Sequence, residues 1–218
     1  MTLLQTAGDP TQAEVVYSKL KADLMVGARG PSCKLSIRSV AEDIEAGAAP
    51  VREALKRLAS ERVLESGTKR SYRVPDLDDS RAVDLFNLRA LLECEAAALA
   101  LPNLGPSRLP ALRAAAAVMG EALTSGQLDD YMVANRNFHF LIYDQCGNGD
   151  MIAIIEQLWM QTGPSLRAGI RAAESDINWN CHHMEMIAAI EARDGAKLRQ
   201  EMLRDISWGA EHYTQKRA

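Results

Sequence analysis

Aromatic residues and long hydrophobic runs are both scarce in this chain, and each scarcity excludes some classes of protein. Only 5% of the 218 residues are aromatic, although hydrophobic residues make up 47%. Alanine and leucine are abundant, a composition that favours helices over sheets. The longest apolar runs, such as 96–101, are too short to cross a bilayer, and no basic segment followed by an apolar one marks a secretory leader. We therefore expect a mostly helical, cytoplasmic protein with no membrane partner.

Cysteine is also sparse, and its spacing excludes the common cysteine motifs. The four cysteines are widely scattered, and none forms a CxxC pair. A zinc site built from cysteine pairs is therefore not expected, and in a reducing cytosol the four side chains should be free thiols.

Charge is distributed unevenly along the chain. The net charge is −4, which argues weakly against nucleic acid as the only partner. Residues 50–73, however, hold seven basic and three acidic side chains. A small basic region in the first part of the chain, followed by a larger acidic region, indicates two modules with separate functions.

The first 75 residues show the pattern of a winged helix-turn-helix. Residues 1–11 are polar and expected to fray, and helical spacing of apolar residues begins at 12. Ser36 is a candidate N-cap for a second helix, and a third helix is expected from Ala48, with Pro50 in its first turn. Two short strands at 63–65 and 72–74, joined by a turn at 66–68, complete the module, which we place at 12–75.

Residues 76–218 have helical periodicity throughout. Breaks are expected at 102–106, 125–126, 146–149, 163–164 and 194–195, which gives about six helices of roughly 12 to 24 residues. Neither strand alternation nor a fixed-period repeat is present. The pattern predicts a helical bundle large enough to enclose a ligand.

Several stretches resemble one family of regulators. "SVAEDIEAGAAPVREALKRLASERVLE" and the later "KRSYRV" resemble the winged helix of GntR-type transcription regulators. "LFNLRALLECEAAALA", "NRNFHFLIYDQCGN" and "HHMEMIAAIEARDGAKL" resemble the FadR-like effector domain called FCD. The resemblance runs from about residue 14 to 210. It implies a winged helix-turn-helix followed by an all-helical effector-binding and dimerisation bundle at 76–218. It also implies a homodimer on palindromic double-stranded operator DNA, usually a repressor, that responds to a small carboxylic acid.

The expected DNA contacts lie on the third helix and around it. Arg52 and Lys56 share a stripe away from the apolar face, where Arg52 can pair with a guanine. Phosphate contacts are expected from Arg57, Arg38, Lys69 and Arg70. The family usually has a Ser-Arg-Thr-like triplet where this chain has Gly47-Ala48-Ala49, and glycine where it has Ser71. The alternative for the basic stripe is a solvated helix face that pairs with neighbouring glutamates.

The resemblance also places a candidate metal site in the bundle. Many family members hold a divalent metal with an aspartate and three histidines. Asn135 stands at the aspartate position, His139 and His183 at the first two histidine positions, and Asp205 at the last. Imidazoles, a carboxylate and an amide oxygen suit zinc, nickel or manganese. The alternative is a polar pocket without metal, in which the histidines are hydrogen-bonded in the core.

Three arginines are candidates for binding the effector acid. Arg89 and Glu93 form an i,i+4 pair, which fits either a structural ion pair or an arginine that faces the acid. Arg167 and Arg171 repeat this spacing and can clamp a carboxylate, although a solvated helix end explains them equally well.

Two other functions fit parts of the sequence. One is a metal-binding or small-molecule-binding protein whose DNA binding is weakened or lost, as the glycine-alanine triplet indicates. The other is a metal-dependent hydrolase that uses His139, His183 and Asp205, but no evident general base accompanies that set. We do not expect an enzyme.

Overall fold

The computed structural model describes residues 9–67, 71–172 and 181–214. It divides into two compact units, and the mostly helical fold class expected from the sequence is confirmed. Unit 1 comprises Met1–Ala22 and Ser32–Pro75, and unit 2 comprises Asp23–Pro31 and Asp76–Ala218. The end of the first helix and the loop after it therefore group with the helical bundle.

Unit 1 begins with helix α1 (Gln12–Met25), the last turn of which belongs to unit 2. Thr11 caps this helix: its hydroxyl accepts from the Glu14 amide at 3.2 Å, and the Glu14 carboxylate accepts from the Thr11 amide at 2.7 Å. This reciprocal cap satisfies amides that would otherwise lack a helical partner. Val16 and Leu20 on the same helix are buried, whereas Val15 is 42% exposed.

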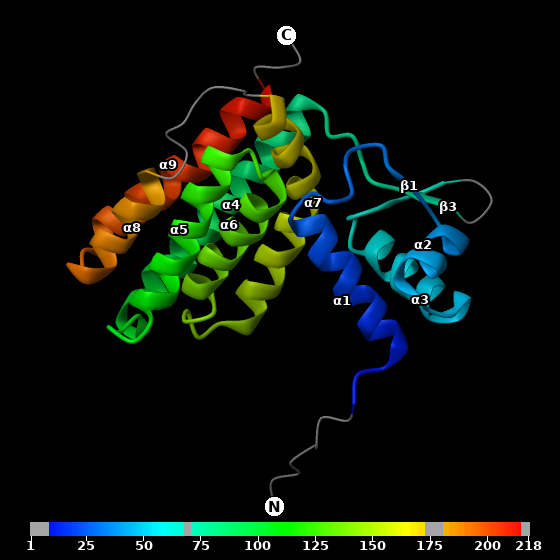
Figure 1. Ribbon diagram of the computed structural model, residues 1–218, viewed down its shortest axis with the longest axis horizontal. Coiled ribbons are helices and arrows are strands. Elements are labelled where there is room, and N and C mark those ends of the chain that lie inside the picture. The colour runs from blue at the N-terminus through cyan, green and yellow to red at the C-terminus, as the bar shows by residue number, and fades with distance from the viewer. Residues whose placement is uncertain (1–8, 68–70, 173–180, 215–218) are drawn as a thin grey trace, which may run out of the picture. The chain divides into compact units, whose positions relative to one another are not determined.

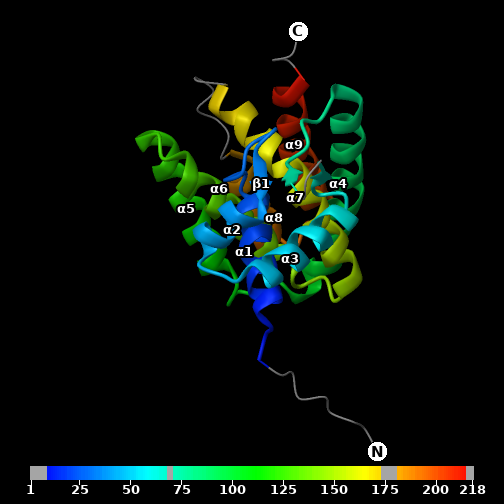
Figure 2. The ribbon, with the colours of Figure 1, turned by 90° about the vertical axis from the view of Figure 1, so that its right-hand side faces the viewer.

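Helices α2 (Ile37–Ile44) and α3 (Ala48–Ser60) pack against each other, as Figure 2 shows. Ser36 caps α2 as expected, through a reciprocal bond with Ser39. Gly47 occupies the N-cap position of α3 and makes no side-chain cap bond. The predicted apolar stripe of α3 is confirmed, because three of its members are fully buried: Val51, Leu55 and Leu58.

The sheet of unit 1 has three strands where the sequence predicted two. Strands β1 (Lys34–Ser36), β2 (Glu65–Ser66) and β3 (Ser71–Arg73) are antiparallel in the order β1-β3-β2. β1 was missed because three residues are too few to show alternation. The predicted strand at 63–65 was also misplaced: Val63 and Leu64 are buried, and their amides bond to the Leu58 carbonyl at the end of α3.

Unit 2 is a bundle of helices, seen side by side in Figure 1. Within the described residues α4 packs against α9 and α7, while α5 packs against α6 and α8. Their bounds are α4 Asp79–Ala100, the 3-10 turn η2 Leu101–Asn103, α5 Leu109–Ser125, α6 Leu128–Tyr143, α7 Gly149–Ala172, α8 Cys181–Glu191 and α9 Gly195–Thr214. No helix in the described ranges is both long and apolar enough to cross a membrane.

The predicted break at 163–164 is wrong, because α7 continues through Pro164. Proline disfavours a helical residue before it through clashes with that residue's backbone N–H and its Cβ, and Gly163 lacks the Cβ. A Cβ on Gly163 would also lie only 2.5 Å from the Met25 carbonyl oxygen. The close approach of α1 to α7 therefore requires the same glycine that lets the helix continue.

Candidate metal centre and nucleic-acid interface

Helix α6 supplies two members of the candidate metal site from adjacent turns. Asn135 and His139 are four residues apart, so both project from one face of the helix. Both are buried, with 6% and 0% of their surfaces exposed. His183 from α8 is also fully buried, and Asp205 from α9 completes the group.

The four predicted ligands converge on one point. The Nε2 atom of His183 lies 2.9 Å from Asn135 Oδ1 and 3.3 Å from His139 Nε2. Asp205 Oδ2 lies 3.2 Å from His139 Nε2, and its Oδ1 lies 3.6 Å from His183 Nε2. These contacts bring two imidazole nitrogens and the carboxylate of Asp205 together, with the Asn135 amide oxygen beside His183.

These distances match the requirements of a metal ion. A tetrahedral zinc with bonds of about 2.0–2.1 Å to nitrogen and oxygen places neighbouring ligand atoms about 3.3 Å apart. The measured separations of 2.9 to 3.6 Å lie on both sides of that value. The residues therefore fit a divalent cation in both chemistry and spacing.

The two imidazoles keep Asp205 ionised despite its buried surroundings. Burial by itself would raise the pKa of this carboxyl group. His183, and then His139, outweigh that effect and hold the pKa of Asp205 well below its usual range. The site therefore contains a carboxylate that is ready to bind a cation without first losing a proton.

Arg89 on α4 lies in a buried polar network. Its Nε donates to Glu93 Oε1 at 2.6 Å, and its NH1 donates to Thr162 of α7 at 3.3 Å. The guanidinium lies over the Trp159 ring, 4.5 Å from its centroid. Burial opposes the charged form, but the Glu93 carboxylate more than offsets this, so the pKa of Arg89 is raised.

A small cavity connects Arg89 with the candidate metal site. Its lining includes Arg89, Asn135 and Asp205, together with apolar side chains of α4, α7 and α9. From α7 the lining residues are Leu166 and Ile170 rather than Arg167 and Arg171. Arg167 forms an ion pair with Asp129, and Arg171 is exposed in the last turn of α7.

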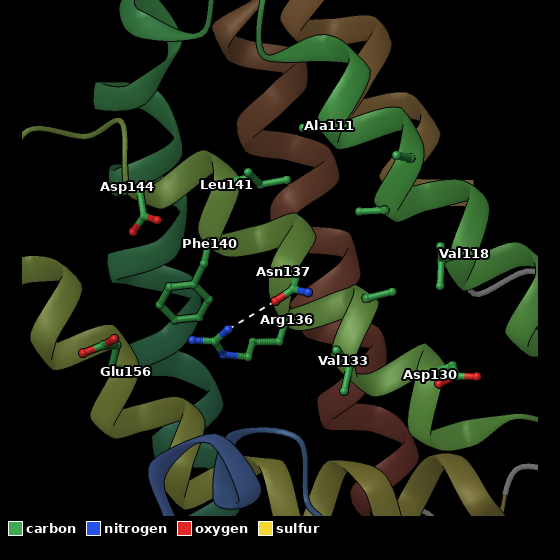
Figure 3. Close-up of a pocket in the computed structure, with 13 residues that line it drawn as sticks. Ala111, Val118, Asp130, Val133, Arg136, Asn137, Phe140, Leu141, Asp144 and Glu156 are labelled. Carbon is green, nitrogen blue, oxygen red and sulfur yellow. Dashed lines mark hydrogen bonds between the residues drawn. The ribbon is translucent and has the colours of Figure 1, made fainter. Parts of the chain in front are cut away.

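A second, larger depression lies elsewhere in unit 2. A groove of about 720 Å³ runs between α5 and α6, with an apolar floor that includes Val118, Val133 and Phe140 (Figure 3). Its edge carries three carboxylates, from Asp130, Asp144 and Glu156. Arg136 also lines the groove, so one guanidinium stands against three carboxylates, and the net negative charge is unfavourable for a carboxylic acid.

Tyr143 is the partner of His139 that sequence reasoning missed. This tyrosine is fully buried. Its hydroxyl, however, lies 3.0 Å from His139 Nδ1 and donates to Glu93 at 2.5 Å. The spacing of four residues between 139 and 143 was the available signal, since it places both on one face of a helix.

The candidate DNA-binding side chains that the structure describes lie on the exposed surface of unit 1. Arg38 and Arg52 both border a hollow of about 630 Å³ between α2 and α3, and Lys56 is exposed on α3. Arg57 is partly engaged, because it pairs with Glu61 at 2.9 Å and lies 3.8 Å from the centroid of the Tyr17 ring. Lys69 and Arg70 lie outside the described residues.

A three-stranded winged helix in one unit and a helical bundle with a buried cluster of His139, His183 and Asp205 in the other are the arrangement of a transcription regulator with an effector domain. Family comparison agrees. The profile described as "Bacterial regulatory proteins, gntR family" matches residues 12–74, and the FCD domain profile matches residues 84–207. The chain belongs to the GntR family of transcription regulators and carries an FCD effector-binding domain.

Individual relatives have the same architecture. The chain is 31% identical over 182 residues to the HTH-type transcriptional regulator McbR of Escherichia coli (strain K12), covering 82% of each chain. It is 27% identical over 202 residues to the HTH-type transcriptional repressor GlaR of the same strain, covering 87% of this chain and 92% of GlaR. The solved structure of E. coli McbR/YncC matches with a TM-score of 0.90 at 26% identity, covering 96% of this chain and 100% of that chain. The matching families and relatives are transcription regulators and not enzymes.

Proposed function

We propose that the protein is a cytoplasmic, metal-dependent repressor that binds operator DNA through unit 1 and a small carboxylic acid in unit 2. The observation that carries the proposal is the convergence of Asn135, His139, His183 and Asp205 beside Arg89. A bound divalent cation would supply a Lewis-acid anchor for one oxygen of the effector carboxylate. The repressor role is supported by the name of GlaR, a relative over most of the chain.

Arg89 is the side chain that best fits recognition of the acid. A guanidinium has five N–H donors, and its partners within the described residues are Glu93 and Thr162. It lines the same cavity as Asn135 and Asp205. The cavity of about 20 Å³ has room for about one water, so the surrounding helices must separate to admit an acid, and its carboxylate would then meet the Arg89 guanidinium. Arg167 and Arg171 remain predictions, with a role only if α7 moves.

Helix α7 is positioned to transmit binding toward α1. Thr162 holds Arg89, and the next residue, Gly163, contacts the carbonyl groups at the end of α1. Most of α1 belongs to unit 1. A shift of Arg89 on effector binding would move the part of α7 at Gly163 that packs against the end of α1. This movement would change the relative populations of DNA-binding and non-binding states.

We place the DNA-binding module at 12–75, which lies in unit 1 apart from residues 23–31, with Arg52 and Lys56 of α3 as the main contacts. Arg38, Arg57, Lys69 and Arg70 supply phosphate contacts. The alanines at the start of α3 lack hydrogen-bonding side chains, so the operator should differ from that of family members with Ser-Arg-Thr there. Arg52 can still provide one bidentate contact to guanine.

A homodimer is required to place two such modules on a palindrome. We propose that the outer face of α4 supplies the contact. Leu88, Leu91 and Leu99 share this face and are 45%, 61% and 42% exposed. Leu91→Glu should then shift the protein from dimer to monomer by light scattering. Val133→Glu, an equally polar change on the α5–α6 groove, should not, and dimers that survive Leu91→Glu would exclude this face.

The proposed function is tested by fluorescence anisotropy with full-length protein and labelled duplex DNA from upstream of its own coding sequence. Zinc-loaded and EDTA-treated protein are compared at salt concentrations from about 50 to 200 mM, where nonspecific binding weakens steeply. We expect binding that exceeds that of a scrambled duplex and changes when small carboxylic acids are added.

The second candidate function is a metal-binding or small-molecule-binding protein with weakened or lost DNA binding. It is favoured by the absence of a side-chain cap at Gly47 and of polar groups at Ala48 and Ala49. Zinc binding without any sequence-specific anisotropy change would support it over the regulator. Replacing 47–49 with Ser-Arg-Thr should in that case restore DNA binding.

A further inference from the structure

A buried chain of hydrogen bonds lies behind His139. The Tyr143 hydroxyl lies 3.0 Å from His139 Nδ1 and 2.5 Å from Glu93 Oε2. All three residues have 0% of their surface exposed. His139 therefore has its Nε2 on the side of the candidate metal site and its Nδ1 on the side of Tyr143.

The number of available protons fixes the direction of these bonds. A phenol has one hydrogen, and a carboxylate can only accept. The hydrogen of Tyr143 goes to Glu93, which is closer and a stronger acceptor than Met202 Sδ at 3.3 Å. The phenolic oxygen must then accept from His139, so Nδ1 carries a proton and a neutral ring has its free lone pair on Nε2.

The geometry gives Tyr143 the donor role that this direction requires, because its hydroxyl lies 2.5 Å from the Glu93 carboxylate, which can only accept. No cationic side chain within the described residues donates to the phenolic oxygen, so the carboxylate remains its main polar partner besides His139.

Glu93 connects this chain to the second functional group of the site. Its Oε1 accepts from Arg89 Nε at 2.6 Å, and its Oε2 accepts from Arg89 NH2 at 3.3 Å as well as from Tyr143. One carboxylate thus holds both the proposed effector arginine and, through Tyr143, the proposed metal ligand.

We propose that Glu93 and Tyr143 are positioning residues that hold His139 in its Nδ1–H form, with Nε2 directed at the metal. The same two residues connect the metal ligands to Arg89. Partners behind a ligating histidine fix its tautomer and orientation and make it a better ligand. The inference rests on the proposed metal site, but the tautomer itself exists without the metal and can be measured separately.

The experiment compares wild-type, Tyr143→Phe and Glu93→Gln full-length proteins after EDTA treatment. Zn²⁺ affinity is measured by titration calorimetry, and the ring-nitrogen shifts of His139 by ¹⁵N NMR of the metal-free protein. The matched control is Tyr17→Phe, which removes a phenol that donates to Glu61 at 2.8 Å in unit 1. Circular dichroism verifies that each variant is folded.

We expect Tyr143→Phe to weaken Zn²⁺ binding about 10- to 100-fold, the usual effect of losing a partner behind a metal ligand. The Nδ1–H signature of His139 should also be lost in this variant, and Tyr17→Phe should match wild type in both measurements. Glu93→Gln should change the same two readouts if it folds.

Unchanged affinity and an unchanged tautomer in Tyr143→Phe would overturn the proposal, as would a wild-type His139 without a proton on Nδ1. If wild-type protein binds no Zn²⁺, the metal part of the proposed function fails, and the NMR comparison alone still decides whether Tyr143 sets the tautomer.

Discussion

His139 and His183 direct their Nε2 atoms at each other across 3.3 Å, although they lie 44 residues apart on different helices. Two imidazole nitrogens at this distance can share a hydrogen bond from one N–H, or can bind a metal ion placed between them. Asp205, at 3.2 and 3.6 Å from these two atoms, adds the negative charge that stabilises such a cation. The contact is therefore the centre of the proposed sensory site.

The adjacent histidines of α8 provide a direct test of this site. His183→Ala removes a ligand and should lower Zn²⁺ affinity by more than about 100-fold, a larger effect than losing an outer partner. His182 instead lies 2.9 Å from Glu201, so His182→Ala should leave calorimetric Zn²⁺ binding unchanged. Equal losses in both variants would count against the assigned ligand set.

Asn135→Asp should strengthen metal binding, because a carboxylate is a better ligand than an amide oxygen. We expect at least about a tenfold gain in Zn²⁺ affinity, which corresponds to 1.4 kcal/mol. Without metal, two carboxylates in one buried site repel each other, so the melting temperature should fall. Asn137→Asp, the same change at an exposed position, is the control, and scanning fluorimetry with and without Zn²⁺ distinguishes them. A metal-free melting temperature above wild type would refute the reasoning.

Arg52→Ala should weaken DNA binding more than Arg57→Ala. Arg57 is held by Glu61 and Tyr17, whereas Arg52 borders the hollow between α2 and α3. Loss of one phosphate contact lowers the slope of log affinity against log salt by about 1, and loss of a base contact relaxes specificity. Anisotropy titrations at several salt concentrations measure both, with Arg108→Ala in unit 2 as the control. A larger effect of Arg57→Ala would reverse the assignment.

Gly163→Ala should destabilise the protein, since its new Cβ would meet the Met25 carbonyl oxygen at 2.5 Å. Overpacking of this kind costs about 1–3 kcal/mol, which lowers the melting temperature of a chain this size by about 2–10 °C. Gly149→Ala on the same helix adds a Cβ in open space and should have little effect. Identical melting curves for the two variants would show that the end of α1 does not pack as closely against Gly163 of α7 as the distances indicate.

Alkylation by iodoacetamide should discriminate among the four thiols. Burial raises the pKa of Cys94 to about 11, and its side chain is 3% exposed. Only the thiolate reacts, so Cys94 should remain unlabelled in the native protein even at about pH 9, where little of it is ionised. Cys33 and Cys181 are partly exposed and should react first, as mass spectrometry of the digested protein will show. Labelling of Cys94 as fast as Cys181 would mean that α4 and α9 open readily.

The local features of the fold were largely predictable from the sequence. The cap at Ser36, the buried stripe of α3 and the pairing of Asn135 with His139 on one helix face all follow from spacing within a single helix. Such features depend on neighbours within four residues, whose relative positions are set by helix geometry. β1 and the continuity of α7 were not predictable, because they depend on β3 and on the carbonyls of α1.

The same distinction holds for the site. The resemblance assigned Asn135, His139, His183 and Asp205 to one site by their motif positions. The distances that make them a coherent ligand set arise only when α6, α8 and α9 pack together. The link from His139 through Tyr143 and Glu93 to Arg89 joins residues 50 apart, and only the contact of α4 with α6 brings them within hydrogen-bond distance.

The sequence by itself determined the family, the helical class and the side chains available for binding, because composition, periodicity and motifs are local properties of the chain. The tertiary structure decided which of those side chains meet: it brought the four candidate ligands and Arg89 together, and it left Arg167 paired with Asp129. Burial and packing determine these contacts, and both depend on the whole fold.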